Sequence, residues 1–332
     1  MTETDTRAAS PIFVVGCGRS GTTMLRLMLD AHPDLAVPWE SHFIVSLWRD
    51  RRRYARPGGV DAHRMVRDIA DSPMFGQWKV PDEILRRRLD ALVAPQFADV
   101  IDAVFMSYAE TRGKRRWGDK TPIYVRSLPM LSTLFPTARF VHVIRDGRDV
   151  ALSYLSVPWG PNDVWRAAHR WKQDVSTGRR DGPALGQGRY LEIRYEDLVR
   201  DPRAALESIC RIADLPFVEG MLEYHRDGSE RLASPEAHKA YHASASKPPT
   251  AGLRDWRSQM EPEASMAFES VAGDLLEELG YPRRYSSLPL GLRIEATARM
   301  TGLRLWTVAG KGRKAFERAT GTRKPMERLG PV

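Results

Sequence analysis

The sequence lacks several features that would place it in other classes of protein. It contains no run of about 18 consecutive apolar residues, so we expect no membrane-spanning helix. Its first ten residues, MTETDTRAAS, are polar and offer no apolar core for a signal peptide, so we expect a cytoplasmic protein. It has no internal repeat, which excludes a repeat rod.

Cysteine is also scarce. Only Cys17 and Cys210 occur, and they do not form a CxxC pair. This excludes a disulfide framework and a structural zinc site, and it suits a reducing cytoplasm.

Positive charge is present but confined to one end. The chain of 332 residues has a net charge of +9, and residues 285–332 supply +7 of it through ten Lys or Arg against three Glu. Positive and negative charges almost cancel in the remainder of the chain, so we expect no nucleic-acid partner. In this tail Leu303, Leu305 and Trp306 alternate with basic residues, and two interpretations stay open: peripheral contact with an anionic membrane, or a helix packed on the domain.

Length and a hydrophobic content of 42% are those of an ordinary globular protein. We predict a disordered tail over residues 1–10, a single domain over residues 11–284 and a basic extension over residues 285–332. The sequence does not determine the oligomeric state.

Short apolar runs alternate with helical patterns along the predicted domain. The runs at residues 12–15, 35–37, 140–144 and 190–193 lack polar alternation, which is typical of buried parallel strands. The alternation predicts an α/β fold, a P-loop-like parallel sheet flanked by helices on both faces, with a helical insertion over residues 41–112. Ligands of such sheets bind beyond the carboxyl ends of the strands.

The first predicted strand runs into a glycine loop, GCGRSGTT, at residues 16–23. Backbone N–H groups of such a turn, with the following helix N-terminus, can cradle an anion. The spacing of Gly16 and Gly21 matches half of the ATP-binding pattern GxxxxGK[ST], but Thr22 replaces the lysine and the cation is Arg19. This favours a nucleotide whose transferred group carries less charge than a terminal phosphate.

Three motifs together resemble the sulfotransferases that use 3′-phosphoadenosine 5′-phosphosulfate (PAPS), and tyrosylprotein sulfotransferases in particular. They are RSGTTMLRLMLDAHP from Arg19, DKTP from Asp119 and LFPTARFVHVIRDGRDVALS from Leu134. The similarity runs in order over residues 11–280 and fades between Ser41 and Arg116. It implies transfer of a sulfuryl group to a hydroxyl or amine, release of 3′-phosphoadenosine 5′-phosphate (PAP), no metal, and an acceptor side built by the helical insertion.

The resemblance also implies roles for individual residues. In the family a glycine loop binds the 5′-phosphosulfate, an arginine and a serine bind the 3′-phosphate, and a glutamate acts as base beside a catalytic lysine. These roles fall on Arg19, Ser20, Gly21, Thr22 and Thr23 for the 5′ end; on Arg145 and Ser153 for the 3′-phosphate; on Tyr195, Lys247 and Gly252 for the rest of the nucleotide; and on Arg19, Glu40 and Lys120 for catalysis.

Other roles for these residues stay open. Burial near a sulfate would raise the pKa of Glu40 toward working pH, as a base requires, but Glu40 could instead be a rim carboxylate paired with an arginine, and His42 is an alternative base. Lys120 could pair with Asp119, and the Tyr195 ring could pack under the sheet edge.

The position of Arg145 in the sequence independently supports a role in binding an anion. Arg145 would sit at a strand end, and Ser153, two turns into the next helix, can face the same groove. The competing interpretation is a local ion pair between Arg145 and Asp146 that caps the helix.

The acceptor is the least determined part of the prediction. Gly18 stands where the family usually has proline, and the cysteine pairs and membrane anchor of the tyrosylprotein enzymes are missing. We therefore expect a small molecule, a sugar or a lipid rather than an acidic peptide. Two other functions remain as alternatives: a small-molecule kinase with an aberrant P-loop, and a nonenzymatic nucleotide-responsive protein of the membrane surface.

Overall fold

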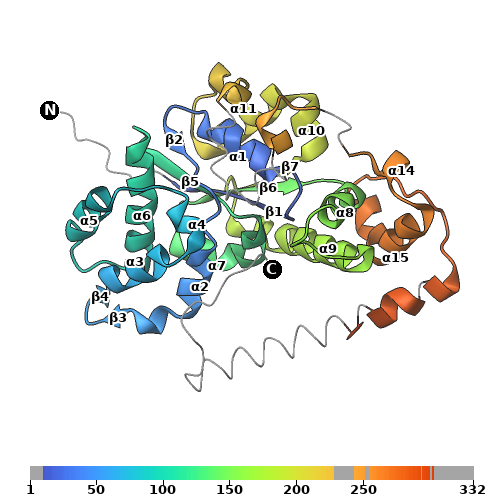
Figure 1. Ribbon diagram of the computed structural model, residues 1–332, viewed down its shortest axis with the longest axis horizontal. Coiled ribbons are helices and arrows are strands. Elements are labelled where there is room, and N and C mark those ends of the chain that lie inside the picture. The colour runs from blue at the N-terminus through green and yellow to red at the C-terminus, as the bar shows by residue number, and fades with distance from the viewer. Residues whose placement is uncertain (1–9, 228–242, 251–253, 293, 300, 303–332) are drawn as a thin grey trace. The chain divides into compact units, whose positions relative to one another are not determined.

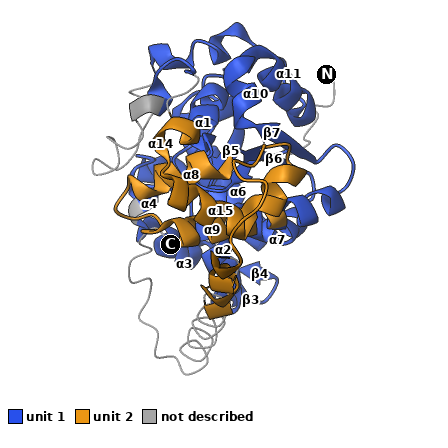
Figure 2. Ribbon diagram, turned by 90° about the vertical axis from the view of Figure 1, so that its right-hand side faces the viewer, with its two compact units in different colours: residues 1–144, 177–251 blue, residues 145–176, 252–332 orange. Residues whose placement is uncertain are grey.

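The computed structural model divides the chain into two compact units (Figure 2), residues 1–144 with 177–251 and residues 145–176 with 252–332. Among the residues that the structure describes, no helix is long and apolar enough to cross a membrane. Gly252 and two thirds of the basic tail lie outside the described residues, which are 10–227, 243–250, 254–292, 294–299 and 301–302.

A five-stranded parallel sheet forms the centre of the first unit, in the order β2-β5-β1-β6-β7 (Figure 1). The order confirms the predicted α/β fold, and four of the five strands lie where apolar runs predicted them. Their bounds are β1 (Ile12–Gly16), β2 (Leu35–Ala36), β6 (Arg139–Ile144) and β7 (Tyr190–Arg194).

The fifth strand, β5 (Arg116–Lys120), was not predicted. Its sequence, RWGDK, has a single large apolar residue, yet it pairs with both β1 and β2. Trp117 packs into the core, and Gly118 is required because a Cβ there would lie 2.9 Å from the Ile12 carbonyl oxygen. Tertiary contacts rather than an apolar pattern therefore make this segment a strand.

Side chains of the sheet alternate between two hydrophobic layers. Phe13 and Val15 of β1 enter one layer, whereas Ile12 and Val14 enter the other. The first layer is covered by α2 (Phe43–Arg49), α3 (Ala62–Ala70), α4 (Pro73–Gly76), α5 (Asp82–Asp90), α6 (Phe97–Thr111) and α7 (Leu128–Leu134), and the second by α1 (Thr22–Asp30), α10 (Tyr195–Arg200) and α11 (Pro202–Ala213).

The predicted helical insertion corresponds to α2 through α6, between β2 and β5. It also contains a hairpin of β3 (Ala55–Arg56) and β4 (Gly59–Val60), which was not predicted. Aromatic rings join the insertion to the sheet: Phe105 stacks on Trp117 with ring centroids 4.2 Å apart. The 3₁₀ turns within the described residues are η1 (Arg51–Arg53), η2 (Pro122–Ser127), η3 (Pro183–Leu185), η4 (Glu219–Met221), η5 (Tyr224–Arg226) and η6 (Ala243–Ser246).

The second unit contains α8 (Gly147–Leu155), most of α9 (Val164–Asp181), α14 (Trp256–Gln259) and α15 (Pro262–Glu278). A buried ion cluster joins three of these helices. Arg148 pairs with Asp146 and Glu269, each at 2.8 Å, and its guanidinium lies 3.4 Å from the Trp256 ring centroid. This cluster holds α14 and α15 against the beginning of α8.

Candidate active site

The glycine loop leaves the carboxyl end of β1 and turns into α1. Positive φ angles occur at Gly21, the N-cap of α1, with φ 88°, and at Arg19, with φ 71°. A non-glycine residue in that region is strained, which is a common feature of ligand-binding turns. The hydroxyl of Ser20 is fully buried and makes no hydrogen bond to any residue that the structure describes. The loop therefore has the shape of an anion cradle, with a buried donor to spare.

The ring of Tyr195 packs directly on this loop. Tyr195 is the first residue of α10, immediately after β7. A Cβ added to Gly21 would lie 2.3 Å from the Tyr195 ring, so only glycine fits there. Tyr195 thus supports the loop from the side.

A buried lysine connects the loop to the end of β2. The Nζ atom of Lys120 lies 2.5 Å from Glu40 Oε1 and donates to Thr23 Oγ1 at 3.3 Å. The side chain of Lys120 is 0% exposed, and its ammonium lies 4.5 Å from the ring centroid of Trp39. Burial lowers the pKa of Lys120, and Glu40 opposes that shift. Cation, carboxylate and hydroxyl from three elements thus meet in one place, and Lys120 pairs with Glu40 rather than with Asp119.

The charge state of Glu40 differs from the prediction. Burial raises the pKa of the Glu40 carboxyl, but Lys120 and a hydrogen bond from His42 more than offset it, so the pKa lies well below its usual range. The predicted upward shift is wrong because the carboxylate has two partners that stabilise its charge. The alternative of a pairing with an arginine is not what the contacts show.

The third member of this group is His42. Its Nε2 atom lies 2.8 Å from Glu40 Oε2, and its side chain is 32% exposed against 19% for Glu40. His42 is the N-cap of α2 and has φ 54°, a left-handed backbone. His42 therefore combines a strained backbone conformation with a side-chain contact to the Glu40 carboxylate, two residues earlier in the chain.

A second polar cluster lies in the second unit, where Arg145 follows β6 directly. The Arg145 Nη2 atom lies 3.4 Å from Asp149 Oδ2. Asp146 accepts from the backbone N–H of Arg148 at 3.0 Å, so it caps α8, and it forms an ion pair with the side chain of Arg148. Ser153 is buried further along α8.

Arg254 is a member of this cluster that the sequence analysis missed. It donates to Ser156 Oγ at 3.1 Å, and burial and then the charge of Arg145 lower its pKa, while Asp149 raises it. Two guanidinium groups that repel one another, beside one carboxylate, favour a doubly charged anion. The available signal was its position just before Trp256 in the late loop.

The remaining predicted nucleotide residue that the structure describes is Lys247. Its side chain is exposed, and its carbonyl oxygen accepts from the hydroxyl of Tyr224 at 2.5 Å. The preceding turn η6 contacts α1, so this segment is held beside the helix that follows the glycine loop.

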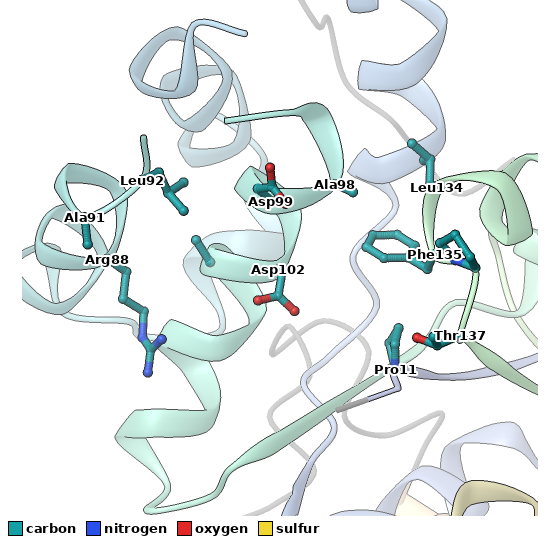
Figure 3. A pocket seen from close by; sticks show the side chains of 12 residues that line it. Pro11, Arg88, Ala91, Leu92, Ala98, Asp99, Asp102, Leu134, Phe135 and Thr137 are labelled. Carbon is teal, nitrogen blue, oxygen red and sulfur yellow. The ribbon is translucent and has the colours of Figure 1, made fainter. Parts of the chain in front are cut away.

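One cavity (Figure 3) has none of these residues in its lining. Pro11 and Thr137, which precede β1 and β6, line it, so it is at the amino ends of the strands. Its half-buried carboxylate, Asp102, accepts from Trp117 Nε1 at 2.7 Å. Among the described residues, no group of three or more His, Cys, Asp or Glu could hold a metal ion.

Comparisons of sequence agree with the motifs. A family model described as "Sulfotransferase family" matches residues 11–219. Protein-tyrosine sulfotransferase A of Caenorhabditis elegans is 24% identical over 303 residues, which cover 89% of this chain and 73% of that protein. Protein-tyrosine sulfotransferase 2 of Gallus gallus is 25% identical over 218 residues, which cover 64% of this chain and 53% of that protein. The chain thus spans about half the length of the chicken relative.

Comparisons of structure agree with the fold. The sulfotransferase domain from the Synechococcus PCC 7002 olefin synthase has a TM-score of 0.58 at 23% identity, covering 85% of this chain and 98% of that domain. The sulfotransferase domain from the curacin biosynthetic pathway has a TM-score of 0.53 at 19% identity, covering 86% of this chain and all of that domain.

Proposed function

This chain belongs to the sulfotransferase family, and we propose that it moves the sulfuryl group of PAPS to a hydroxyl or amine acceptor by in-line transfer. The observation that carries this proposal is the contact of Lys120 with both Glu40 and Thr23, beside a loop whose Ser20 hydroxyl is buried and unbonded within the described part of the chain. A base, a cation and an anion cradle are the three groups that sulfuryl transfer needs.

The low pKa that Lys120 and His42 give Glu40 makes its carboxylate a weak base in the resting protein, so we propose that the proton transfer is coupled to a shift of the Lys120 charge toward the leaving group. The acceptor oxygen bonds to sulfur, the bond from sulfur to the 5′-phosphate oxygen breaks, and the acceptor proton passes to Glu40. Once protonated, Glu40 no longer neutralises Lys120, and the ammonium is then available to the negative charge that grows on the leaving oxygen. Arg19, with Ser20, Thr22 and the loop N–H groups, stabilises the same phosphate.

His42 is a second candidate for the base, because it contacts Glu40 and is the more exposed of the two. The test is a pair of isosteric variants. If Glu40 is the base, Glu40→Gln lowers kcat by about 10²–10⁴-fold and His42→Gln by much less; the reverse order assigns the proton to His42.

For the other end of the nucleotide we propose Arg145, Ser153 and Arg254 as ligands of the 3′-phosphate. The support is the two mutually repelling guanidinium groups near Asp149. Tyr195, Lys247 and Gly252 remain proposed contacts to the rest of the nucleotide.

For the acceptor we propose a small molecule, a sugar or a lipid. The departures from the tyrosylprotein pattern, at Gly18 and across the helical insertion where the motifs fade, support this choice. The names of the relatives in Caenorhabditis elegans and Gallus gallus make a tyrosine hydroxyl the alternative.

The direct test incubates the protein with PAPS and a panel of phenols, sugars, lipids and tyrosine peptides, with ATP in parallel. We expect one class to gain sulfate while PAP accumulates, without added metal. Phosphorylated products from ATP, with no PAP formed from PAPS, would establish the kinase alternative instead.

A further inference from the structure

A buried hydrogen-bond network lies behind the proposed catalytic pair. Glu40 and Ser41 are consecutive, as are Asp119 and Lys120, and consecutive residues of an extended chain point to opposite sides. Glu40 meets Lys120 at 2.5 Å, and Ser41 Oγ donates to Asp119 Oδ2 at 2.7 Å. Two adjacent contacts therefore join the same two segments. The contact between Glu40 and Lys120 lies in the proposed active site, and the contact between Ser41 and Asp119 is fully buried behind it.

Two chains of hydrogen bonds end on the carboxylate of Asp119. In the first, the Ser41 N–H donates to Thr121 Oγ1 at 3.0 Å, and that hydroxyl donates to Asp119 Oδ1 at 2.9 Å. In the second, the Ile44 N–H donates to the Tyr124 hydroxyl, 3.0 Å away, and that hydroxyl lies 3.0 Å from Ser41 Oγ.

The direction of the second chain follows by elimination. Because the Ser41 proton goes to Asp119, the Tyr124 hydroxyl must donate to Ser41. Both chains thus begin at backbone N–H groups of the segment that carries Glu40 and His42. They end on the two oxygens of Asp119, and an ionised carboxylate accepts from both hydroxyls with no proton of its own to donate.

We propose that Asp119 and Ser41 are positioning residues, which fix the Glu40 segment on β5 and so hold the Glu40 carboxylate at Lys120 for sulfuryl transfer. This inference rests on the proposed function. Burying a carboxylate whose hydrogen-bond donors are both hydroxyl groups opposes folding, because no cation of the described residues forms an ion pair with Asp119 to offset the desolvation. A carboxylate at position 119 thus lowers stability, which is consistent with a role in positioning Glu40.

The ionisation of Asp119 supplies an independent readout. Burial raises its pKa to about 6, although Ser41 and Thr121 lower it by hydrogen bonding, His42 lowers it and Glu40 raises it through their charges. A protonated carboxyl would present one donor where the network needs two acceptors. The wild-type kcat should therefore decline as the pH falls below about 6.

The experiment uses water as the acceptor, so that no natural substrate is needed: hydrolysis of PAPS to PAP and sulfate is followed by chromatography. Ser41→Ala removes a link, and Asp119→Asn removes one acceptor with little change of shape. The matched control is Ser107→Ala, because Ser107 is equally buried but donates to the Ala103 carbonyl within α6.

We expect Ser41→Ala and Asp119→Asn each to lower kcat by roughly 10–100-fold, since a misplacement of about 1 Å can cost that much. The affinity of both variants for PAP should stay within about threefold of wild type. The kcat of the double variant should be no lower than that of the less active single variant. The kcat of Asp119→Asn should no longer decline as the pH falls below about 6. The control should keep its kcat within about twofold.

Two results would overturn the inference: a kcat for both variants within about twofold of wild type, or a loss of PAP affinity that parallels the loss of kcat. If Ser41→Ala does not fold, Tyr124→Phe removes the preceding link and is judged by the same criteria. A wild-type protein that neither binds PAP nor hydrolyses PAPS contradicts the proposed function itself, which is a different failure.

Discussion

The pair of Lys120 and Glu40 allows stability and catalysis to be separated in one set of variants. Glu40→Gln leaves a fully buried ammonium without its counter-ion, and Lys120→Met leaves the carboxylate without its cation. At 2.5 Å and an effective dielectric constant of about 20, the Coulomb attraction of the pair is about 6–7 kcal/mol. Desolvation of the ammonium offsets part of this attraction.

Removing one partner of a buried ion pair costs about 3–5 kcal/mol of unfolding free energy. Because the Glu40 side chain is 19% exposed, water can solvate part of the group left behind, and we expect about 2–4 kcal/mol for each single variant. The double variant Glu40→Gln/Lys120→Met carries neither charge, so it should recover about 2 kcal/mol of the summed loss.

The assay is chemical denaturation followed by circular dichroism, with PAPS hydrolysis measured on the same samples. We expect the double variant to be more stable than the two single losses added together, and yet inactive. Stability losses that simply add, with a coupling below about 0.5 kcal/mol, would refute the argument that the two charges hold one another in place.

Three further predictions follow from other contacts. Gly21→Ala should weaken PAP binding in calorimetry by at least about tenfold, because a Cβ there would lie 2.3 Å from the Tyr195 ring; unchanged affinity would show that the loop is not the cradle. Arg254→Ala should weaken PAP by about tenfold but leave adenosine 5′-monophosphate unaffected, and equal losses for both ligands would contradict a 3′-phosphate contact. The folded-state pKa of Glu40 lies below its ordinary value of 4.5, so its contribution to stability is present above pH 4.5 and lost as the pH falls further. When thermal unfolding is measured above and below pH 4.5, the stability of Glu40→Gln should fall less steeply with decreasing pH than that of the wild type. The same dependence of stability on pH in both proteins would disprove this prediction.

The sequence predicted those parts of the fold that depend on local pattern. The apolar runs at β1 and β6 and the glycine turn between β1 and α1 are local signals, and they lie where predicted. Strand β5 has no such signal, because the burial of Asp119 and Lys120 depends on partners far away in the chain.

The candidate site shows the same division. The types of residue at Arg19, Glu40 and Lys120 followed from a resemblance to known motifs, whereas the sign of the Glu40 pKa depended on distances that no sequence contains. Arg254 was missed because its neighbour Arg145 lies 109 positions earlier, so that only the folded chain reveals their mutual repulsion.

The most direct test of the whole account is calorimetric titration of the wild-type protein, Arg19→Ala and Arg145→Ala with PAP, and of the wild type with ATP. The account predicts micromolar binding of PAP by the wild type without metal, loss of that binding in both variants, and no heat with ATP. Tight binding of ATP, or PAP binding that survives both substitutions, would contradict it.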